Sequence, residues 1–484
     1  MATVIIKDEV NCKITDLSLN TRRKLVKEFK YKIPHAIYTP AYKLGRWDGT
    51  ISFCSLAAVS YVNLLRDIET ILSEDNYQLE LDDQRDYRTH FEFDPVDENT
   101  FSHITWPDKH RFSGEPILLR DYQVEAVNAF LDNPQSIQCL ATGSGKTITV
   151  AALSDRVQKY GRSIIIVPNK SLITQTEKDY KNLQLDTGVY YGERKEYGHD
   201  HTICTWQSLN VLLKSTKEGT ADITIQEFLE GVISVIVDEC HQVKADVLRD
   251  LLTGVMAKIP LRWGLTGTIP PEDYNMQSLN VSIGPVVNEL FASELQDRGV
   301  LASCHVDILQ LKDYAEHNNY QSELKYLLSN PDRLDHIASI ISRISDHGNT
   351  LVLVDRVSAG KELESRLSNA VFISGATKGT SRQDEYDKIA DVNNRTIIAT
   401  YGVAAVGISI DRLFNLVLIE PGKSFIRVIQ SIGRGLRKAS DKDFVQIYDI
   451  TSTCKYAKSH LAKRKKYYKE AGYKYTLKKK EWKS

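Results

Sequence analysis

The chain has 484 residues, 42% hydrophobic and 26% charged, an ordinary composition for a globular protein of about three domains. No apolar run reaches the roughly 18 residues that a membrane span needs, and residues 1–8 carry charge where a signal peptide has an apolar core. Seven scattered cysteines without a C-x-x-C pair argue against a disulfide framework or a zinc site, and favour a reducing compartment.

Residues 1–81 alternate short strand and helix patterns, which predicts a small α+β domain. Asp48-Gly49 predicts a two-residue hairpin turn in which both residues have positive φ. Aromatic and basic residues crowd this turn, among them Arg46 and Trp47, and such a mixture suits phosphate contact with base stacking. The alternative is a small core that buries Trp47. Residues 82–116 are acidic, contain three prolines and are predicted to be a linker.

A glycine-rich turn follows an apolar strand near residues 137–140 and opens a helix, with the sequence Thr142-Gly143-Ser144-Gly145-Lys146-Thr147. Its backbone N–H groups and the helix N-terminus favour a phosphate. Lys146 can reach the β- and γ-phosphates, and the Thr147 hydroxyl can bind Mg²⁺. The strict pattern G-x-x-x-x-G-K-[ST] is not met, because Leu140 stands at the first glycine. We expect a bound nucleotide with Mg²⁺ here; the alternative is a chance turn.

Apolar runs alternate with helical patterns after the turn, which predicts a parallel sheet covered on both faces. Active groups in such sheets lie at the carboxyl ends of strands. Asp238 and Glu239 follow the apolar run 232–237 directly. Asp238 can hold Mg²⁺, while Glu239 can orient and deprotonate the attacking water. The alternative is a solvated loop. Upstream, Gln123 can pair with adenine through its carboxamide, or can simply be solvated.

A second series of strands and helices begins near residue 292, without a phosphate loop of its own. It contains Arg434 and Arg437, three apart on one helical face, which fits arginine fingers or surface ion pairs. Residues 455–484 then carry 12 Lys/Arg against 2 Glu, interleaved with aromatic residues. These residues predict nucleic-acid contact by Lys463, Arg464, Lys465 and Lys466. The alternative is a helix that folds back on the second domain.

These motifs, in this order, resemble the core of the superfamily 2 helicases, which is two RecA-like parallel-sheet domains in tandem with ATP between them. The resemblance implies that Arg120 and Gln123 read adenine, that Gly407 belongs to the nucleotide site, and that Arg434 and Arg437 complete it. It assigns coupling of hydrolysis to domain movement to His241, Thr266, Thr268 and Gln430. It assigns nucleic-acid contact to Pro168, Asn169, Thr205, Gln207 and Thr400. One departure is Ser409, where many relatives have Asp.

Residues 40–51, Pro-Ala-Tyr-Lys-Leu-Gly-Arg-Trp-Asp-Gly-Thr-Ile, are similar to a segment of the phage UvsW helicases. That resemblance implies an ATP-dependent helicase that unwinds branched DNA and RNA–DNA hybrids in recombination, repair and replication, in the cytoplasm of an infected host. It also implies recombination or single-strand-binding proteins as partners. Alternatives are an RNA helicase, a non-enzymatic nucleic-acid binder and a P-loop kinase.

The expected fold is therefore α/β, with two RecA-like parallel-sheet domains, a small α+β N-terminal domain and a basic C-terminal extension. The expected boundaries are 1–81 for the N-terminal domain, 82–116 for the linker, 117–290 and 291–452 for the two RecA-like domains, and 453–484 for the extension.

Overall fold

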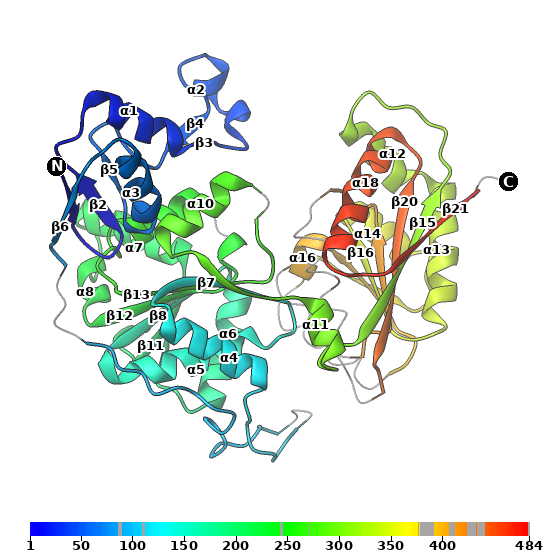
Figure 1. Cartoon of the computed structure of the whole chain (residues 1–484). Helices are drawn as coiled ribbons and strands as arrows, with labels where there is room; N and C mark the ends of the chain where they lie inside the picture. The colour runs from blue at the N-terminus through cyan, green and yellow to red at the C-terminus, as the bar shows by residue number, and fades with distance from the viewer. Residues whose placement is uncertain are drawn as a thin grey trace. The chain divides into compact units, whose positions relative to one another are not determined.

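Two parallel sheets organise the computed structural model, which describes residues 1–85, 90–108, 112–242, 245–270, 272–375, 377, 392–405, 412–423, 432 and 441–482. The chain divides into two compact units (Figure 1). The first unit contains residues 1–140 and 145–289. The second unit contains residues 290–484 together with the short turn 141–144.

The N-terminal part of the first unit is a four-stranded sheet in the order β5-β2-β1-β6. Alternate residues such as Val4, Ile6 and Ile14 point into a small core, as the period of a half-buried strand requires. Its elements are β1 Ala2–Ile6, β2 Asn11–Ile14, α1 Leu19–Glu28, β5 Val59–Tyr61, α3 Leu65–Glu74 and β6 Leu79–Asp83.

The hairpin predicted at Asp48-Gly49 is wrong. Strand β4, Thr50–Ser52, pairs antiparallel with β3, Lys30–Lys32, so a long segment rather than a two-residue turn joins the strands. Gly49 has a φ of 76°, but Asp48 is not left-handed. Instead, the Asp48 carboxylate accepts hydrogen bonds from the backbone N–H and the hydroxyl of Thr50, at 3.1 and 2.6 Å. The joining segment contains the short helices η1, Ala36–Tyr38, and α2, Pro40–Lys43.

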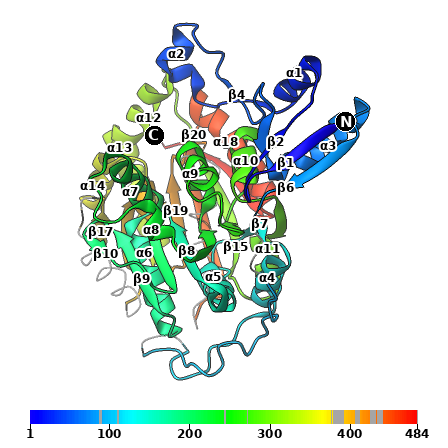
Figure 2. The same ribbon diagram turned by 90° about the vertical axis from the view of Figure 1, so that its left-hand side faces the viewer.

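The N-terminal sheet shares its core with helix α10, Asp273–Ser282, of the same unit (Figure 2). Tyr274 and Val281 are buried in that core. The ring of Phe53 stacks on Tyr274 at a centroid distance of 6.1 Å, and the Arg249 guanidinium lies over Phe53. The N-terminal domain is therefore packed firmly on the rest of the first unit.

The large sheet of the first unit has eight strands in the order β10-β9-β11-β8-β12-β13-β7-β14. The pairings from β9 to β7 are parallel, as the apolar runs predicted. The strands are β7 Gln135–Leu140, β8 Arg162–Val167, β9 Thr187–Tyr191, β10 Arg194–Lys195, β11 His201–Thr205, β12 Val232–Val237, β13 Leu261–Thr266 and β14 Val286–Leu290.

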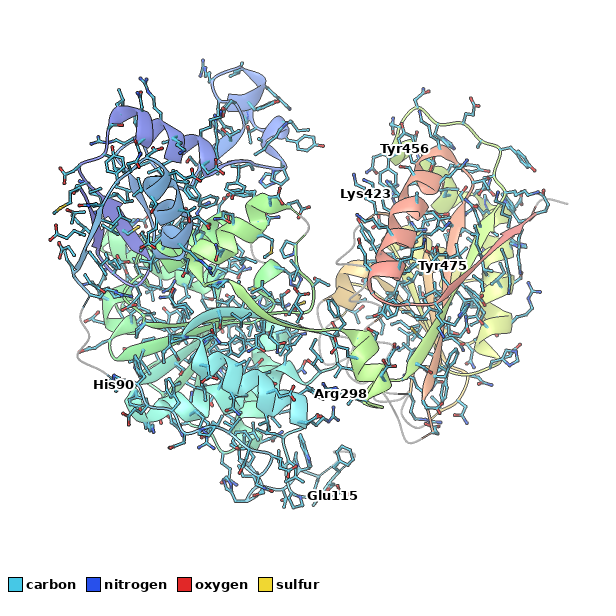
Figure 3. All side chains as sticks on the ribbon, viewed as in Figure 1. His90, Glu115, Arg298, Lys423, Tyr456 and Tyr475 are labelled. Carbon is cyan, nitrogen blue, oxygen red and sulfur yellow. The ribbon has the colours of Figure 1, made fainter. Side chains whose placement is uncertain are left out.

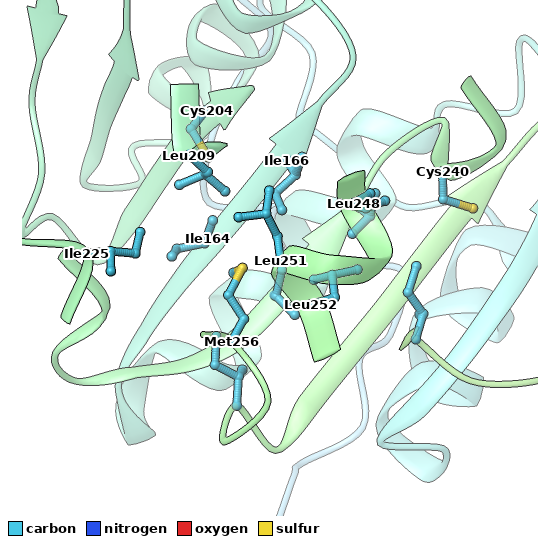
Figure 4. Packing of buried hydrophobic residues seen from close by; sticks show 14 of the residues in the cluster. Ile164, Ile166, Cys204, Leu209, Ile225, Cys240, Leu248, Leu251, Leu252 and Met256 are labelled. Atoms are coloured by element: carbon cyan, nitrogen blue, oxygen red, sulfur yellow. The ribbon is translucent and has the colours of Figure 1, made fainter. Parts of the chain in front are cut away.

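Helices cover this sheet on both sides. They are α4 Asp121–Asp132, α5 Lys146–Val157, α6 Lys170–Asn182, α7 Trp206–Glu218, α8 Ile225–Leu229, α9 Ala245–Thr253 and α10. Leu251 and Leu252 of α9 pack with Ile164 and Ile166 of β8, and Met256 closes the same cluster (Figure 4). Close packing of such side chains is the main source of stability for this layer.

The acidic segment after β6 lies along helix α4 and its neighbours. The Asn128 side chain exchanges two hydrogen bonds with the backbone of Val96, at 2.8 and 3.0 Å. Phe101, Ile104 and Ile117 are buried. The described part of this segment is therefore packed on the first unit by apolar contacts.

The second unit has seven strands in the order β17-β18-β16-β19-β20-β15-β21, all parallel. They are β15 Ser303–Leu311, β16 Thr350–Val354, β17 Ala370–Ile373, β18 Thr396–Thr400, β19 Asn415–Ile419, β20 Phe444–Ser452 and β21 Tyr475–Lys480. Its helices are α11 Ala292–Asp297, α12 Tyr320–Ser329, α13 Pro331–Ser345, α14 Val357–Glu364, α16 Tyr401–Ala405 and α18 Lys455–Glu470.

The predicted fold class, two tandem parallel-sheet domains with a small α+β domain in front, is confirmed. The basic extension forms α18 and β21, and β21 joins the second sheet as an edge strand beside β15. Among the described residues no helix is long and apolar enough to cross a membrane. All seven cysteines are free thiols.

Candidate active site

Five segments predicted to carry function follow neighbouring strands of the first sheet. In the spatial order β11-β8-β12-β13-β7, the strands end at Thr205, Val167, Val237, Thr266 and Leu140. Because these strands are parallel, the segments that follow them emerge at one edge of the sheet. The fold thus brings together strand ends that are as far apart in sequence as Leu140 and Thr266.

The phosphate-loop lysine is held at this edge. Lys146 is the first residue of helix α5, after Gly145 with a φ of 85°. Its Nζ donates to the carbonyl of Leu140 at 3.2 Å and lies 3.5 Å from Glu239 Oε1. Leu140, which replaces the usual first glycine, is the buried last residue of β7. Thr147 follows Lys146 in the first turn of α5, where backbone N–H groups are free of intrahelical partners.

Gln123 lies against the loop. A Cβ added to Gly145 would meet Gln123 Nε2 at 2.4 Å, so only glycine allows this approach. The Gln123 side chain is 4% exposed, and its Oε1 accepts from the backbone N–H of Arg120 at 2.9 Å. The Arg120 guanidinium donates to the Tyr122 hydroxyl at 2.8 Å. The carboxamide predicted to read adenine is therefore fixed in orientation beside the loop.

Two carboxylates follow β12. Glu239 has a φ of 49°, in the left-handed region that non-glycine residues rarely adopt, and its N–H donates to Asp238 Oδ1 at 2.9 Å. Loss of solvent and the neighbouring Glu239 carboxylate raise the pKa of Asp238, against the opposing charge of Lys146. A bound divalent cation would favour the charged form instead. The Asp238 carboxylate and the Thr147 hydroxyl are hard oxygen donors, which suit Mg²⁺.

A hydrogen-bonded chain links the carboxylates to the end of β13. His241 Nδ1 lies 2.5 Å from Thr266 Oγ1 and 3.4 Å from Glu239 Oε2. The Thr266 hydroxyl donates to the Thr268 carbonyl at 2.6 Å, so it must accept the proton of His241 Nδ1. Burial lowers the pKa of His241, which keeps the ring neutral. Thr268 Oγ1 is buried and has no hydrogen-bond partner among the described residues. His241, Thr266 and Thr268 are three of the four residues predicted to couple hydrolysis to movement, and the structure brings them together.

The predicted nucleic-acid contacts of the first sheet are helix caps. Asn169 Oδ1 accepts from Leu172 N at 3.1 Å and caps α6, directly after the buried Pro168. Thr205 Oγ1 accepts from Ser208 N at 3.2 Å and caps α7, beside the exposed Gln207. The helix N-termini at this edge are suited to phosphate.

In the second unit, Thr400 ends β18, and its hydroxyl accepts from Val403 N at 3.4 Å. The predicted residues Gly407, Ser409, Gln430, Arg434 and Arg437 lie outside the described residues.

The structure contradicts the prediction that Arg464 contacts nucleic acid. Arg464 is 1% exposed and pairs with Asp449 of β20 through two nitrogens, at 2.8 and 2.9 Å. Lys463 and Lys466 are exposed, whereas the Lys465 ammonium lies over the ring of Tyr475. Tyr475, labelled in Figure 3, is the first residue of β21. Helix α18 therefore packs one face on the second sheet and turns the other outward.

The aromatic prediction at the N-terminal domain also changes. Trp47 packs against the N-terminal core and its Nε1 donates to the Thr50 carbonyl at 2.8 Å, which favours the core alternative. Arg46 is exposed.

Sequence reasoning missed an acidic residue of the second unit. Glu420 follows the apolar strand β19 directly, has a φ of 42° and is buried. It accepts from Arg333 Nη2 at 2.7 Å and from Thr451 at 3.1 Å, and Arg333 also lies 3.3 Å from Asp313. An acid directly after an apolar run is the same signal that identified Asp238.

Comparisons with known proteins find similar sequences among restriction enzymes and DNA helicases. Residues 116–271 match the family model described as "Type III restriction enzyme, res subunit". The ATP-dependent DNA helicase uvsW of Enterobacteria phage T4 is 24% identical over 476 residues, which cover 93% of this chain and 91% of that protein. The DNA 3'-5' helicase XPB of Kineococcus radiotolerans is 26% identical, over 74% of this chain and 64% of its own length.

Among solved structures, the ATP-dependent Type ISP restriction-modification enzyme LlaBIII bound to DNA has the same fold over 87% of this chain, with a TM-score of 0.56 and 16% identity. The match spans only 36% of that enzyme. The resemblance to UvsW-type superfamily 2 helicases, indicated by the motifs, is confirmed by the sequence comparisons.

Proposed function

We propose that this chain is an ATP-dependent DNA helicase that unwinds branched DNA and RNA–DNA hybrids and drives branch migration. The relatives named as ATP-dependent helicases confirm the prediction of a helicase-type enzyme. The observation that carries the proposal is the position of Lys146 Nζ, between the Leu140 carbonyl and the Glu239 carboxylate at the edge where Asp238 also lies.

In this proposal the triphosphate lies on the loop 142–147 and replaces the contacts that Lys146 makes in its absence. Asp238 and Thr147 would hold Mg²⁺, which when bound neutralises charge on the β- and γ-phosphates. Glu239 takes the proton of the attacking water, and its left-handed backbone directs the carboxylate to the edge where Lys146 and His241 lie. Arg120 and Gln123 bind the base, and Arg434 and Arg437 stabilise charge on the γ-phosphate in the transition state.

Nucleic acid is proposed to bind along the same sheet edge through Asn169, Thr205 and Gln207, together with Thr400 of the second unit. Contacts of this kind go mainly to phosphate and carry little sequence preference. The exposed lysines of α18 add to this grip. Recombination or single-strand-binding proteins are proposed partners.

The test is an ATPase and unwinding assay on a fork, a four-way junction, an RNA–DNA hybrid and an RNA duplex of matched length. We expect the fork or junction to stimulate hydrolysis most, and Lys146→Ala to abolish hydrolysis while DNA binding stays within a few fold. Lys159→Ala, at an exposed lysine of the same unit, is the matched control. Strongest stimulation by the RNA duplex would make the chain an RNA helicase, and DNA-stimulated turnover in Lys146→Ala would refute the site.

A further inference from the structure

The segment 33–49 between β3 and β4, here called the projection, stands out from the rest of the first unit (Figures 1 and 2). It exposes three large apolar side chains within eight residues: Ile37, Tyr38 at 72% exposure and Leu44 at 64%. Exposed apolar side chains gathered in this way mark a binding surface more often than scattered ones do.

The projection is held rigid at its base. Ile33 N donates to the carbonyl of Gly49 at 2.9 Å, and Thr39 caps α2. Gly49 lies so close to Ala36 and the Tyr42 ring that a Cβ there would be about 3 Å from both. The exposed tip is therefore ordered before any ligand binds, which lowers the entropy lost on binding.

The charge around the projection suits a polyanion. Residues 22–49 contain eight Lys/Arg against two acidic residues, Glu28 and Asp48. Asp48, the one acidic residue of the projection, is paired with Lys30 at 2.7 Å. Lys43 and Arg46 are exposed beside the apolar tip. A surface that combines exposed cations with an exposed aromatic ring is typical of nucleic-acid contact rather than of an apolar protein interface.

The ring that can stack is Tyr38. Trp47, the residue expected to stack from the sequence, packs on the core and uses its N–H within the domain. Among the described residues the Tyr38 hydroxyl has no hydrogen-bond partner, and the side chain is largely exposed to solvent. An exposed aromatic ring can stack on the terminal base pair of a duplex, because one face of that pair is free. Interior base pairs are stacked on both faces and offer no such position.

We propose that the projection separates DNA strands at a branch, with Tyr38 stacking on the last base pair and Lys43 and Arg46 holding the flanking phosphates. This inference rests on the proposed helicase function and names the DNA structure that the first unit recognises. Stacking on Tyr38 stabilises the opened junction while the motor advances.

The test compares Tyr38→Ala, Tyr38→Phe and the control Tyr197→Ala, which changes an exposed tyrosine elsewhere on the first unit. Fork unwinding and single-strand-stimulated ATPase are measured side by side. We expect Tyr38→Ala to lower unwinding at least about tenfold more than ATPase, in line with the usual contribution of one aromatic–base stack. Tyr38→Phe should keep both activities, and Tyr197→Ala should match the wild type.

A second measurement needs no ATP. A fork with 2-aminopurine at the branch should lose fluorescence when the wild type or Tyr38→Phe binds, and should keep it with Tyr38→Ala. Equal quenching by Tyr38→Ala, equal loss of ATPase and unwinding, or unchanged unwinding would each overturn the proposal. A wild type that quenches at the branch but hydrolyses no ATP on any DNA would overturn the helicase function and leave the stacking contact standing.

Discussion

A glutamate with a positive φ lies close after strand β12 and another after strand β19, but the two carboxylates have different partners. Each strand lies inside its parallel sheet and has a glutamate in the left-handed region close after its end: Glu239, two residues after β12, at a φ of 49°, and Glu420, directly after β19, at 42°. Glu239 is only partly buried and faces Lys146 and His241. Glu420 is buried and bound to Arg333, which is fully buried as well.

The difference shows that partners, not position, decide what such a carboxylate does. In the first unit the nearest cation is Lys146, a residue that a triphosphate can draw away. In the second unit the Arg333 guanidinium donates hydrogen bonds to Glu420, Asp313 and the Leu327 carbonyl. The Glu420 carboxylate is therefore neutralised by a partner that belongs to the fold. A buried ion pair of this kind is costly to break because one partner is then left uncompensated.

The largest effect is expected from Glu239→Gln. If Glu239 takes the proton of the attacking water, DNA-stimulated turnover should fall by about 10²- to 10⁴-fold, while ATP binding and the unfolding midpoint stay close to wild type. Steady-state ATPase and equilibrium nucleotide binding measure this. Glu420→Gln is the matched control at the equivalent strand end, and should lower stability while turnover per folded molecule stays within about twofold. Equal losses of turnover in the two variants would remove the contrast.

The next effect is on stability. Arg333→Met leaves the carboxylates of Glu420 and Asp313 buried without their cation, so it should lower the free energy of unfolding of the second unit by about 3–5 kcal/mol. Denaturant unfolding of the full chain measures this loss. Arg366→Met is the control, because the ion pair of Arg366 with Asp335 lies near the surface and should contribute about 1 kcal/mol or less. A similar loss of unfolding free energy in both variants would show that the buried ion-pair cluster contributes no more to stability than a surface pair.

The smallest effect is expected on DNA binding by helix α18. In this helix Arg464 is buried and ion-paired, whereas Lys463 and Lys466 are exposed. Replacing Lys463 and Lys466 together by Ala should reduce the salt dependence of duplex DNA binding by a slope of about 1.8, if both contact phosphate. Titrations at several salt concentrations measure the slope, with Lys159 and Lys217 replaced by Ala as the control pair. An unchanged slope would assign α18 to packing alone.

Residues whose role depends on their immediate neighbours in the sequence were predictable from the sequence. The apolar run 232–237 predicts strand β12, and the strands of a parallel sheet end at a common edge, so Asp238 and Glu239 could be placed at that edge. Roles that depend on a distant partner were not predictable. Arg464 stands in a run of four cations, and only Asp449 on β20 shows that it faces inward.

The structures of the projection and of β21 also depend on distant partners and were not predictable from the sequence. The Asp48-Gly49 pair is a strong local signal, but the Asp48 carboxylate bonds to Thr50 and Lys30, and pairing with β3 replaces the hairpin. Strand β21 has three consecutive lysines and little apolar pattern, and it is a strand because β15 offers a free edge.

The shared core of the N-terminal domain and helix α10 has a further consequence. With Tyr274 and Val281 buried among the side chains of the N-terminal sheet, Tyr38 and Lys146 belong to one compact unit. We expect the distance between dyes attached near these two residues to stay constant through every turnover. That distance would serve as a fixed reference when the movement of labelled DNA past the protein is followed.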